Sequence, residues 1–218
     1  MSFIWRDYFT KYITMQRNHK IFTVEMLQTL VNKQQQEIRI ISSFLRKKPT
    51  QVLDIGCGLG IYDLALHDFY KNNIKFHLLD KTTTEEEEKK LYYGYNKKGA
   101  FYNNLNYTKE FLMLNGIDEK NINCIIVNDD NNVTNKYLQD NLSNVDLIIS
   151  IISWGFHYPV ETYIDTVHKI LSDDGLLCFH CRDIDNNLPI LSSKFEILHP
   201  IKINIVEGSL LICKKKNN

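Results

Sequence analysis

The residues with the clearest chemical potential lie in one short segment, 52–60. An apolar run ending at Asp54 and Ile55 leads into glycines at alternate positions, Gly56, Gly58 and Gly60. Glycine lets a backbone turn sharply and approach a ligand closely, because a side chain would collide with the ligand or forbid the backbone angles. The following residues have the apolar spacing of a helix, whose first N–H groups would face the same ligand. The segment therefore predicts a cofactor-binding loop, which also includes Cys57 and Leu59.

The spacing of the glycines separates two kinds of cofactor. A dinucleotide-binding loop reads G-x-G-x-x-G, but Ile61 occupies the place of its third glycine. With Asp54 two residues before the first glycine, the order is D-x-G-x-G-x-G, which resembles the first motif of the class I S-adenosylmethionine-dependent methyltransferases. An ordinary strand-to-helix turn is the alternative. The carboxylate and the flanking strand and helix patterns favour the cofactor site.

The bulk composition limits the possible functions. A chain of 218 residues suits one domain, since single domains commonly reach about 250 residues. Its 26 basic and 26 acidic residues balance, so no overall field would attract nucleic acid or a membrane surface. No run approaches the ~18 apolar residues of a membrane span, and the N-terminus lacks the order of a signal peptide. We expect a cytoplasmic protein without nucleic-acid or membrane partners.

The cysteines give little indication of a metal site. There are five, an odd number, and most lie in apolar runs, which favours reduced thiols in the core. Cys178 and Cys181 flank His180, but alternate side chains of a strand point to opposite faces, so these thiols would diverge. We therefore predict no metal.

Apolar strand patterns and helical patterns alternate from residue 51 onward, which is typical of a parallel sheet covered by helices. We expect strands at 51–56, 75–80, 122–128, 145–150, 175–181, 195–202 and 204–213. We expect helices between them at 60–71, 104–115, 133–141 and 159–171. The last two strands have almost no connection and must pair antiparallel. The sequence predicts an α/β fold: a seven-stranded, mostly parallel sheet with a C-terminal antiparallel hairpin and helices on both faces.

Class I methyltransferases end their sheet with such a hairpin, so the resemblance covers about residues 50–215. We divide the chain into an N-terminal helical extension, 1–49, and a methyltransferase domain, 50–218, with an insertion at 82–103. The extension has helical character over 21–46. It either covers the cofactor and acceptor or packs on the edge of the sheet.

The resemblance implies roles for side chains at the ends of successive strands. Asp54 would orient the loop or accept from the amino group of S-adenosylmethionine, and Asp80, at the end of the second strand, would accept from the ribose diol. The end of the third strand would meet the adenine. The implied cofactor-binding residues beyond the loop and Asp80 are Lys81, Asn128, Asp129 and Ser150.

Sequence evidence for the acceptor, the molecule that would receive the methyl group, is less direct. His157 follows the fourth strand, where the family often has a catalytic residue, and could remove the proton of an acceptor hydroxyl; its alternative is a residue that caps the next helix. The loop 150–159 has neither an Asn/Asp-Pro-Pro-Tyr/Phe sequence, common in amino-group methylation, nor a magnesium-binding aspartate as in catechol-type enzymes. The aromatic residues predicted to bind the acceptor are Tyr92, Tyr93, Tyr95, Phe101, Tyr102, Trp154, Phe156 and Tyr158.

Together these features favour O-methylation of a small polar acceptor. Tyrosines beside lysines and asparagines suit a sugar or a sugar derivative. The insertion and the loop 153–159 resemble methyltransferases of surface-polysaccharide synthesis. The alternatives are an RNA or protein methyltransferase, since aromatic side chains also stack on bases, and a non-catalytic partner subunit that binds the cofactor. An NAD-binding protein is a more distant alternative because of Ile61.

Overall fold

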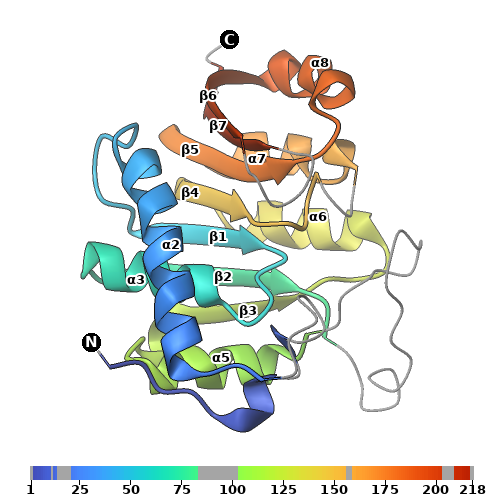
Figure 1. Ribbon diagram of the computed structural model, residues 1–218. Coiled ribbons are helices and arrows are strands. Elements are labelled where there is room, and N and C mark those ends of the chain that lie inside the picture. The colour runs from blue at the N-terminus through green and yellow to red at the C-terminus, as the bar shows by residue number, and fades with distance from the viewer. Residues whose placement is uncertain are drawn as a thin grey trace.

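A seven-stranded sheet forms the centre of the computed structural model, with strand order β3-β2-β1-β4-β5-β7-β6 (Figure 1). The structure describes residues 2–10, 12–13, 21–82, 103–155, 159–202 and 209–216. The strands are β1 Gln51–Ile55, β2 Lys75–Asp80, β3 Ile122–Ile126, β4 Val145–Ser150, β5 Leu171–Cys181, β6 Phe195–Lys202 and β7 Ser209–Lys215. β1 to β5 pair in parallel, whereas β7 runs antiparallel to both β5 and β6. The predicted mostly parallel sheet with a C-terminal antiparallel pair is confirmed.

Helices cover both faces of this sheet, as predicted (Figure 1). The α-helices with described bounds are α2 Val24–Ser42, α3 Ile61–Tyr70, α5 Leu105–Leu114, α6 Asn131–Asn141, α7 Ile164–Ile170 and α8 Ile184–Lys194. Short 3-10 helices span Asp7–Phe9, Glu119–Asn121 and Val160–Thr162. α2 begins where the Thr23 hydroxyl accepts a hydrogen bond from the Met26 N–H, which satisfies one of the free donors of the first turn.

The two faces have separate apolar cores because successive side chains of a strand point in opposite directions. In β1, Val52 belongs to the core under α2, α3 and α5, whereas Leu53 belongs to the core under α6, α7 and α8. In β5, Cys178 and Phe179 divide in the same way. Asp54, one residue beyond Leu53, therefore lies on the face that carries α3.

The described part of the N-terminal segment packs on the same face. α2 lies against α3, and its Leu27, Val31 and Ile38 are fully buried in the core. The backbone of Ile4 exchanges two hydrogen bonds with the Asn115 side chain at the end of α5, at 2.8 and 3.0 Å. These contacts join the segment to α3 and α5. Coverage of a cofactor by this segment stays a prediction.

Several elements differ from the sequence prediction. α8 was not predicted, because Pro189 lies inside it and its first turn is rich in Asp and Asn, residues that favour turns. β5 begins at Leu171, where a helix was expected, and a register shift leaves residues 172–175 outside its regular pairing with β4. β7 ends at Lys215, two residues beyond the expected end, and its expected start at residue 204 lies outside the described residues.

Candidate functional site

The carboxyl ends of β1 and β4 meet at the centre of the sheet. From β1 the chain proceeds outward through β2 to β3, then crosses back to β4 and proceeds outward on the other side. Ligands of open α/β sheets bind at such a reversal, outside the carboxyl ends of the strands. The structure places the glycine loop, Asp80 and Ser150 at this edge.

The three glycines of the loop all adopt left-handed backbone conformations. Their φ angles are 79° at Gly56, 54° at Gly58 and 75° at Gly60, a region that side chains rarely permit. Gly56 also lies against the loop after β4, where a Cβ atom would come within 2.0 Å of Ser153 Oγ. Gly60 is the N-cap of α3. The sequence pattern is therefore required by backbone geometry and by the close approach of two loops.

Both backbone polar groups of Gly58, its N–H and its carbonyl oxygen, are hydrogen-bonded to side chains. Its N–H donates to Asp80 Oδ2 at 2.7 Å. Its carbonyl oxygen accepts from Thr108 Oγ1 at 2.8 Å and from Asn103 Nδ2. Asn103 also donates to Thr108 at 2.8 Å, and both side chains are buried. Sequence reasoning missed these two residues, because they lie 45 and 50 positions from Gly58 and have no local motif.

Asp80 is ordered by backbone donors. Besides Gly58, the N–H of Lys81 donates to Asp80 Oδ1 at 2.7 Å. Burial raises the pKa of this carboxyl to about 6, although the hydrogen bonds from Gly58, Lys81 and Asn103 lower it. The group is therefore mainly ionised at neutral pH and is a strong acceptor at the rim of the glycine loop, suited to the hydroxyls of a diol.

Two buried carboxyls, Asp54 and Asp63, lie beneath the loop. Asp54 is 2% exposed and Asp63, in the first turn of α3, is fully buried. Burial raises the pKa of Asp54 well above its usual value, and the nearby charges of Asp63 and Asp80 raise it further. Burial likewise raises the pKa of Asp63 to about 7. The sequence singled out Asp54 but not Asp63, because an acidic residue in a first helical turn is an ordinary stabilising pattern.

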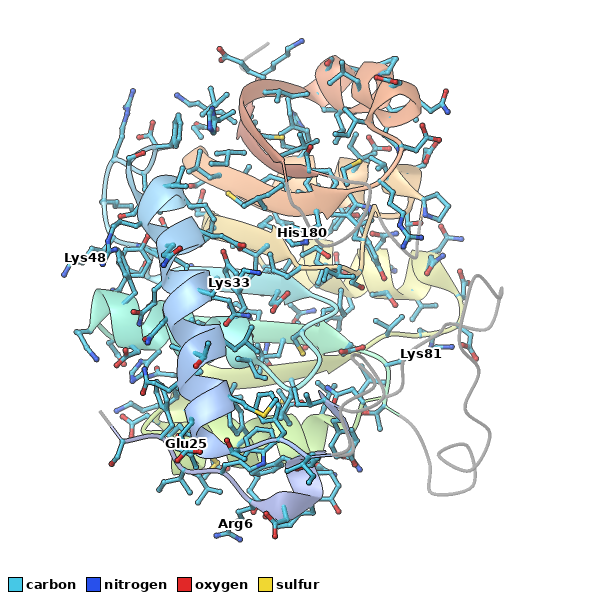
Figure 2. The ribbon with its side chains drawn as sticks, viewed as in Figure 1. Arg6, Glu25, Lys33, Lys48, Lys81 and His180 are labelled. Carbon is cyan, nitrogen blue, oxygen red and sulfur yellow. The ribbon has the colours of Figure 1, made fainter. Side chains whose placement is uncertain are left out.

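The polar side chains after β3 contact one another and Lys81. Lys81 is labelled in Figure 2. Its Nζ lies 2.8 Å from Asp129 Oδ1, and this ion pair joins the chain segments that follow β2 and β3. Asn128 Oδ1 accepts from the N–H of Asp130 at 2.9 Å, and Asp130 caps α6. In this conformation the side chain of Asn128 therefore orders the turn before α6. Roles of Asn128 and Asp129 toward an adenine stay predictions.

Ser150 and Trp154 fix the start of the loop after β4. Ser150 Oγ donates to the Ile55 carbonyl at 2.6 Å and accepts from the Trp154 N–H at 2.9 Å. The Trp154 indole is fully buried, stacks on Phe179 with ring centroids 4.9 Å apart, and donates to the Val160 carbonyl at 3.0 Å. We expected Trp154 to offer aromatic surface to an acceptor. Instead its ring belongs to the core, because strand-end packing and the Nε1 hydrogen bond hold it there.

The other predicted acceptor residues, His157 included, lie outside the described residues: Tyr92, Tyr93, Tyr95, Phe101, Tyr102, Phe156, His157 and Tyr158. A histidine that the sequence analysis did not select, His180, lies at the carboxyl end of β5 (Figure 2). Its Nε2 is buried without a hydrogen-bond partner, and burial lowers its pKa to about 4. This imidazole is neutral at physiological pH.

The cysteines with described environments, Cys178 and Cys181 among them, are all free thiols. Within the described ranges, no three His, Cys, Asp or Glu side chains are grouped so that they could hold a metal ion. In the same part of the chain, no helix combines the length and the apolar character needed to cross a membrane.

Comparison with solved structures identifies methyltransferases with this fold. An S-adenosylmethionine-dependent methyltransferase from Aquifex aeolicus aligns with 90% of this chain and 100% of its own, at 14% identity and a TM-score of 0.55. A methyltransferase from Geobacter sulfurreducens aligns with 97% of this chain and 92% of its own, at 12% identity and a TM-score of 0.54. Fibrillarin from Aeropyrum pernix, crystallised with natively bound S-adenosyl-L-methionine, aligns with 77% of this chain and 67% of its own, at 13% identity and a TM-score of 0.54.

No protein-family model matches the sequence, and no curated protein does. At these identities the likeness to solved structures establishes the fold. The chain has the class I fold of the S-adenosylmethionine-dependent methyltransferases.

Proposed function

We propose that this protein is an S-adenosylmethionine-dependent methyltransferase. The observation that carries the proposal is the position of the Asp80 carboxylate. It accepts a hydrogen bond from the Gly58 N–H at 2.7 Å and lies where the strand order of the sheet reverses. An acidic group at the end of the second strand, beside a left-handed glycine loop, suits a ligand with a ribose diol. The shared fold with proteins that use this cofactor supports the same conclusion.

Each part of the cofactor has a candidate partner in the chain. The backbone of 56–60 would lie against the methionine and ribose portions, with Asp80 accepting from the ribose hydroxyls. Asp54 would receive the amino group, and the side chains beyond Asp80 would lie toward the adenine, namely Lys81, Asn128 and Asp129. The bound cofactor supplies an activated methyl group on its sulfonium, so the chain's own task is to align an acceptor and exclude water.

For the acceptor we propose a hydroxyl of a small polar molecule, with a sugar or sugar derivative first. His157 would take the proton of that hydroxyl as the bond to the methyl group forms. The aromatic residues between Tyr92 and Tyr102 would stack on the ring. The support for this step is the sequence pattern described above.

Titration calorimetry with S-adenosylhomocysteine and with NAD tests the cofactor assignment. We expect S-adenosylhomocysteine to bind and NAD not to bind. Asp80→Ala should weaken binding at least tenfold, since a hydrogen bond to a charged group contributes about 1.5–3 kcal/mol. Asp118→Ala is the matched control, because the Asp118 side chain is 67% exposed and forms an ion pair with Lys120, away from the glycine loop. NAD binding, or equal affinities for native protein and Asp80→Ala, would contradict the proposal.

A substrate screen separates the O-methyltransferase from its alternatives, an RNA or protein methyltransferase and a non-catalytic cofactor-binding subunit. Labelled methyl transfer is measured with hydroxylated small molecules, RNA and protein. Under the proposal, small hydroxylated compounds are methylated, and His157→Ala loses turnover while S-adenosylhomocysteine still binds. Methylation of RNA or protein alone, or cofactor binding with no transfer to any acceptor class, would favour the alternatives.

A further inference from the structure

The strongest feature that the proposed function leaves unused is Asp63. Its side chain lies on α3, the helix that covers the face of β1 toward which Asp54 points. Asp63 is fully buried and Asp54 is 2% exposed. No residue outside the pair donates a hydrogen bond to Asp54 Oδ1 or to either carboxylate oxygen of Asp63. A buried carboxylate in this situation is costly unless it holds a proton or meets a cation.

The groups that face this pair add negative charge or none. Asp80 at the end of β2 raises the pKa of Asp54. The Cys57 thiol of the loop and the Cys124 thiol of β3 have raised pKa values, mainly because of burial and partly because of these carboxylates. Burial also keeps Tyr62 of α3 protonated. Among the described residues, no cationic side chain influences the ionisation of Asp54 or Asp63.

The two carboxyls must therefore share protons in the ligand-free protein. The hydrogen bond between them raises the pKa of Asp54 and lowers that of Asp63. Asp54 is thus the proton donor within the pair, and Asp63 is the acceptor. Asp63 would be ionised above its pKa of about 7, while Asp54 stays protonated.

We propose that the Asp54–Asp63 pair is a proton-exchanging receptor for the ammonium group of the ligand. Asp54 contacts the ammonium, and Asp63 is a positioning residue behind it that receives and releases the shared proton. When the ammonium binds, the proton held between the two carboxyls leaves to solvent, and the ligand's positive charge takes its place. No covalent bond forms or breaks. This inference rests on the proposed function for the identity of the ligand.

The proposal predicts that affinity depends on pH. Because burial keeps the pair protonated near neutral pH, a low pH favours the form that competes with the ammonium. Affinity should rise between about pH 6 and about pH 8, by up to about tenfold per pH unit for one released proton. Asp80 also has a pKa near 6, so its contribution must be separated from that of the pair.

A comparison of two ligands provides that separation. S-adenosylhomocysteine has both the ribose and the amino-acid end with its α-ammonium group, whereas 5′-methylthioadenosine has the same ribose and adenine but lacks the amino-acid end. Titration calorimetry in two buffers of different ionisation enthalpy counts the protons released by each ligand at about pH 7. We expect more proton release with S-adenosylhomocysteine. This readout uses the native protein and does not depend on a variant that folds.

Asp63→Asn then tests the positioning role. The amide keeps the shape of the side chain and donates to Asp54, so Asp54 ionises without sharing a proton. We expect the excess proton release to disappear and the pH dependence of S-adenosylhomocysteine binding to flatten to that of 5′-methylthioadenosine. Asp68→Asn is the control on the same helix, because Asp68 contacts Gln35 and Lys71 instead, and it should behave as the native protein.

Equal proton release by the two ligands, or the same excess in Asp63→Asn as in the native protein, would overturn this inference and leave the proposed function intact. If S-adenosylhomocysteine fails to bind the native protein at any pH, both are overturned. The two failures are therefore distinguishable by calorimetry alone.

Discussion

Asp146 and Asp54 are buried aspartates on the neighbouring strands β4 and β1, but they lie at opposite ends of these strands. We call the side of the sheet where the parallel strands begin the amino edge, and the side where they end the carboxyl edge. Asp146, at the amino end of β4, accepts from the Thr50 N–H at 2.8 Å, the Thr50 hydroxyl at 2.7 Å and the Gln51 N–H at 3.1 Å, and lies 3.0 Å from Lys47 Nζ. Although burial raises its pKa, these contacts lower it below the usual range. The Asp54–Asp63 pair has no such donors. The fold thus supplies hydrogen-bond donors to the buried carboxylate at the amino edge and none from other residues to the buried pair at the carboxyl edge.

The two edges also differ in which residue types adopt left-handed backbone conformations. At the amino edge, left-handed conformations fall on Lys71, which ends α3, and on Asn144, a residue type that tolerates them. At the carboxyl edge, the β-branched Ile152 has a φ of 61°, which costs about 1–2 kcal/mol. Such strain persists where surrounding structure imposes it, commonly near functional sites. The β-branched residue with the strained backbone therefore lies at the carboxyl edge.

The largest effect should come from the amino edge. Asp146→Ala leaves the Thr50 and Gln51 N–H groups without their acceptor, and we expect the free energy of unfolding to fall by about 3 kcal/mol. Urea denaturation at neutral pH measures the change. Asp173→Ala is the control, since the Asp173 side chain is 84% exposed. A loss below about 0.5 kcal/mol would break the comparison between the edges.

At the carboxyl edge, a comparable substitution should affect binding more than stability. Asp80→Asn removes the negative charge but keeps the side-chain shape, so we expect about a 30-fold loss in S-adenosylhomocysteine affinity, or about 2 kcal/mol. The free energy of unfolding should change by less than half as much. Calorimetry and urea denaturation of the same preparation give both numbers. A larger loss of stability than of affinity would show that Asp80 serves the fold.

The pH dependence of stability should have opposite signs at the two edges. The pKa of Asp63 is raised to about 7 in the folded protein, so its contribution is complete at low pH and is lost as the pH rises from about 4 through about 7. The lowered pKa of Asp146 gives a contribution that is present above the unfolded value of about 4 and is lost below it.

Asp63→Asn tests this sign. The variant should lose the decline in unfolding free energy between about pH 5 and about pH 8 and be at least about 1 kcal/mol more stable than the native protein at the upper end. Urea denaturation across that range is the measurement. A native profile that rises over the same range, or a variant parallel to it, would contradict the assignment.

The smallest effect concerns the backbone. Ile152→Gly relieves the left-handed strain but gives the unfolded chain more freedom, so we expect a net gain below about 1 kcal/mol. Asn144→Gly is the matched change at the amino edge, where little strain exists to relieve, and should be neutral or slightly destabilising. Thermal melting of both variants suffices. A gain for Asn144→Gly equal to that for Ile152→Gly would remove the backbone contrast.

Much of the fold follows from local sequence patterns. The strands were predictable because each is a short apolar run between turn residues, and Asp80 was selected because it ends such a run after the glycine loop. α8 was not predicted, because Pro189 and its neighbouring asparagines favour other local structures. Here tertiary packing of residues such as Leu191 overrides local preference.

The site was predictable only in part, because several contacts join distant positions. Asp54 belongs to a recognisable sequence motif. Its partner Asp63 does not, and the pairing follows only from the packing of α3 on that face of β1. The hydrogen bonds of Thr108 and Asn103 to Gly58 cross 50 and 45 residues. The sequence neighbours of Trp154 do not show whether its ring is exposed or buried. The stacking of the ring on Phe179 shows that it is part of the core.

The ends of the insertion lie side by side. Thr82 and Asn103 pair in an isolated bridge, and the Thr82 hydroxyl accepts from the Leu105 N–H at 3.3 Å. Because these two anchors already lie together, no span between them dictates the number of residues in the connection, and doubling the length of a connection costs in general only about 0.6 kcal/mol of closure entropy. A different sequence could therefore be joined between Thr82 and Asn103 while Asn103 keeps its hydrogen bond to the Gly58 carbonyl of the glycine loop.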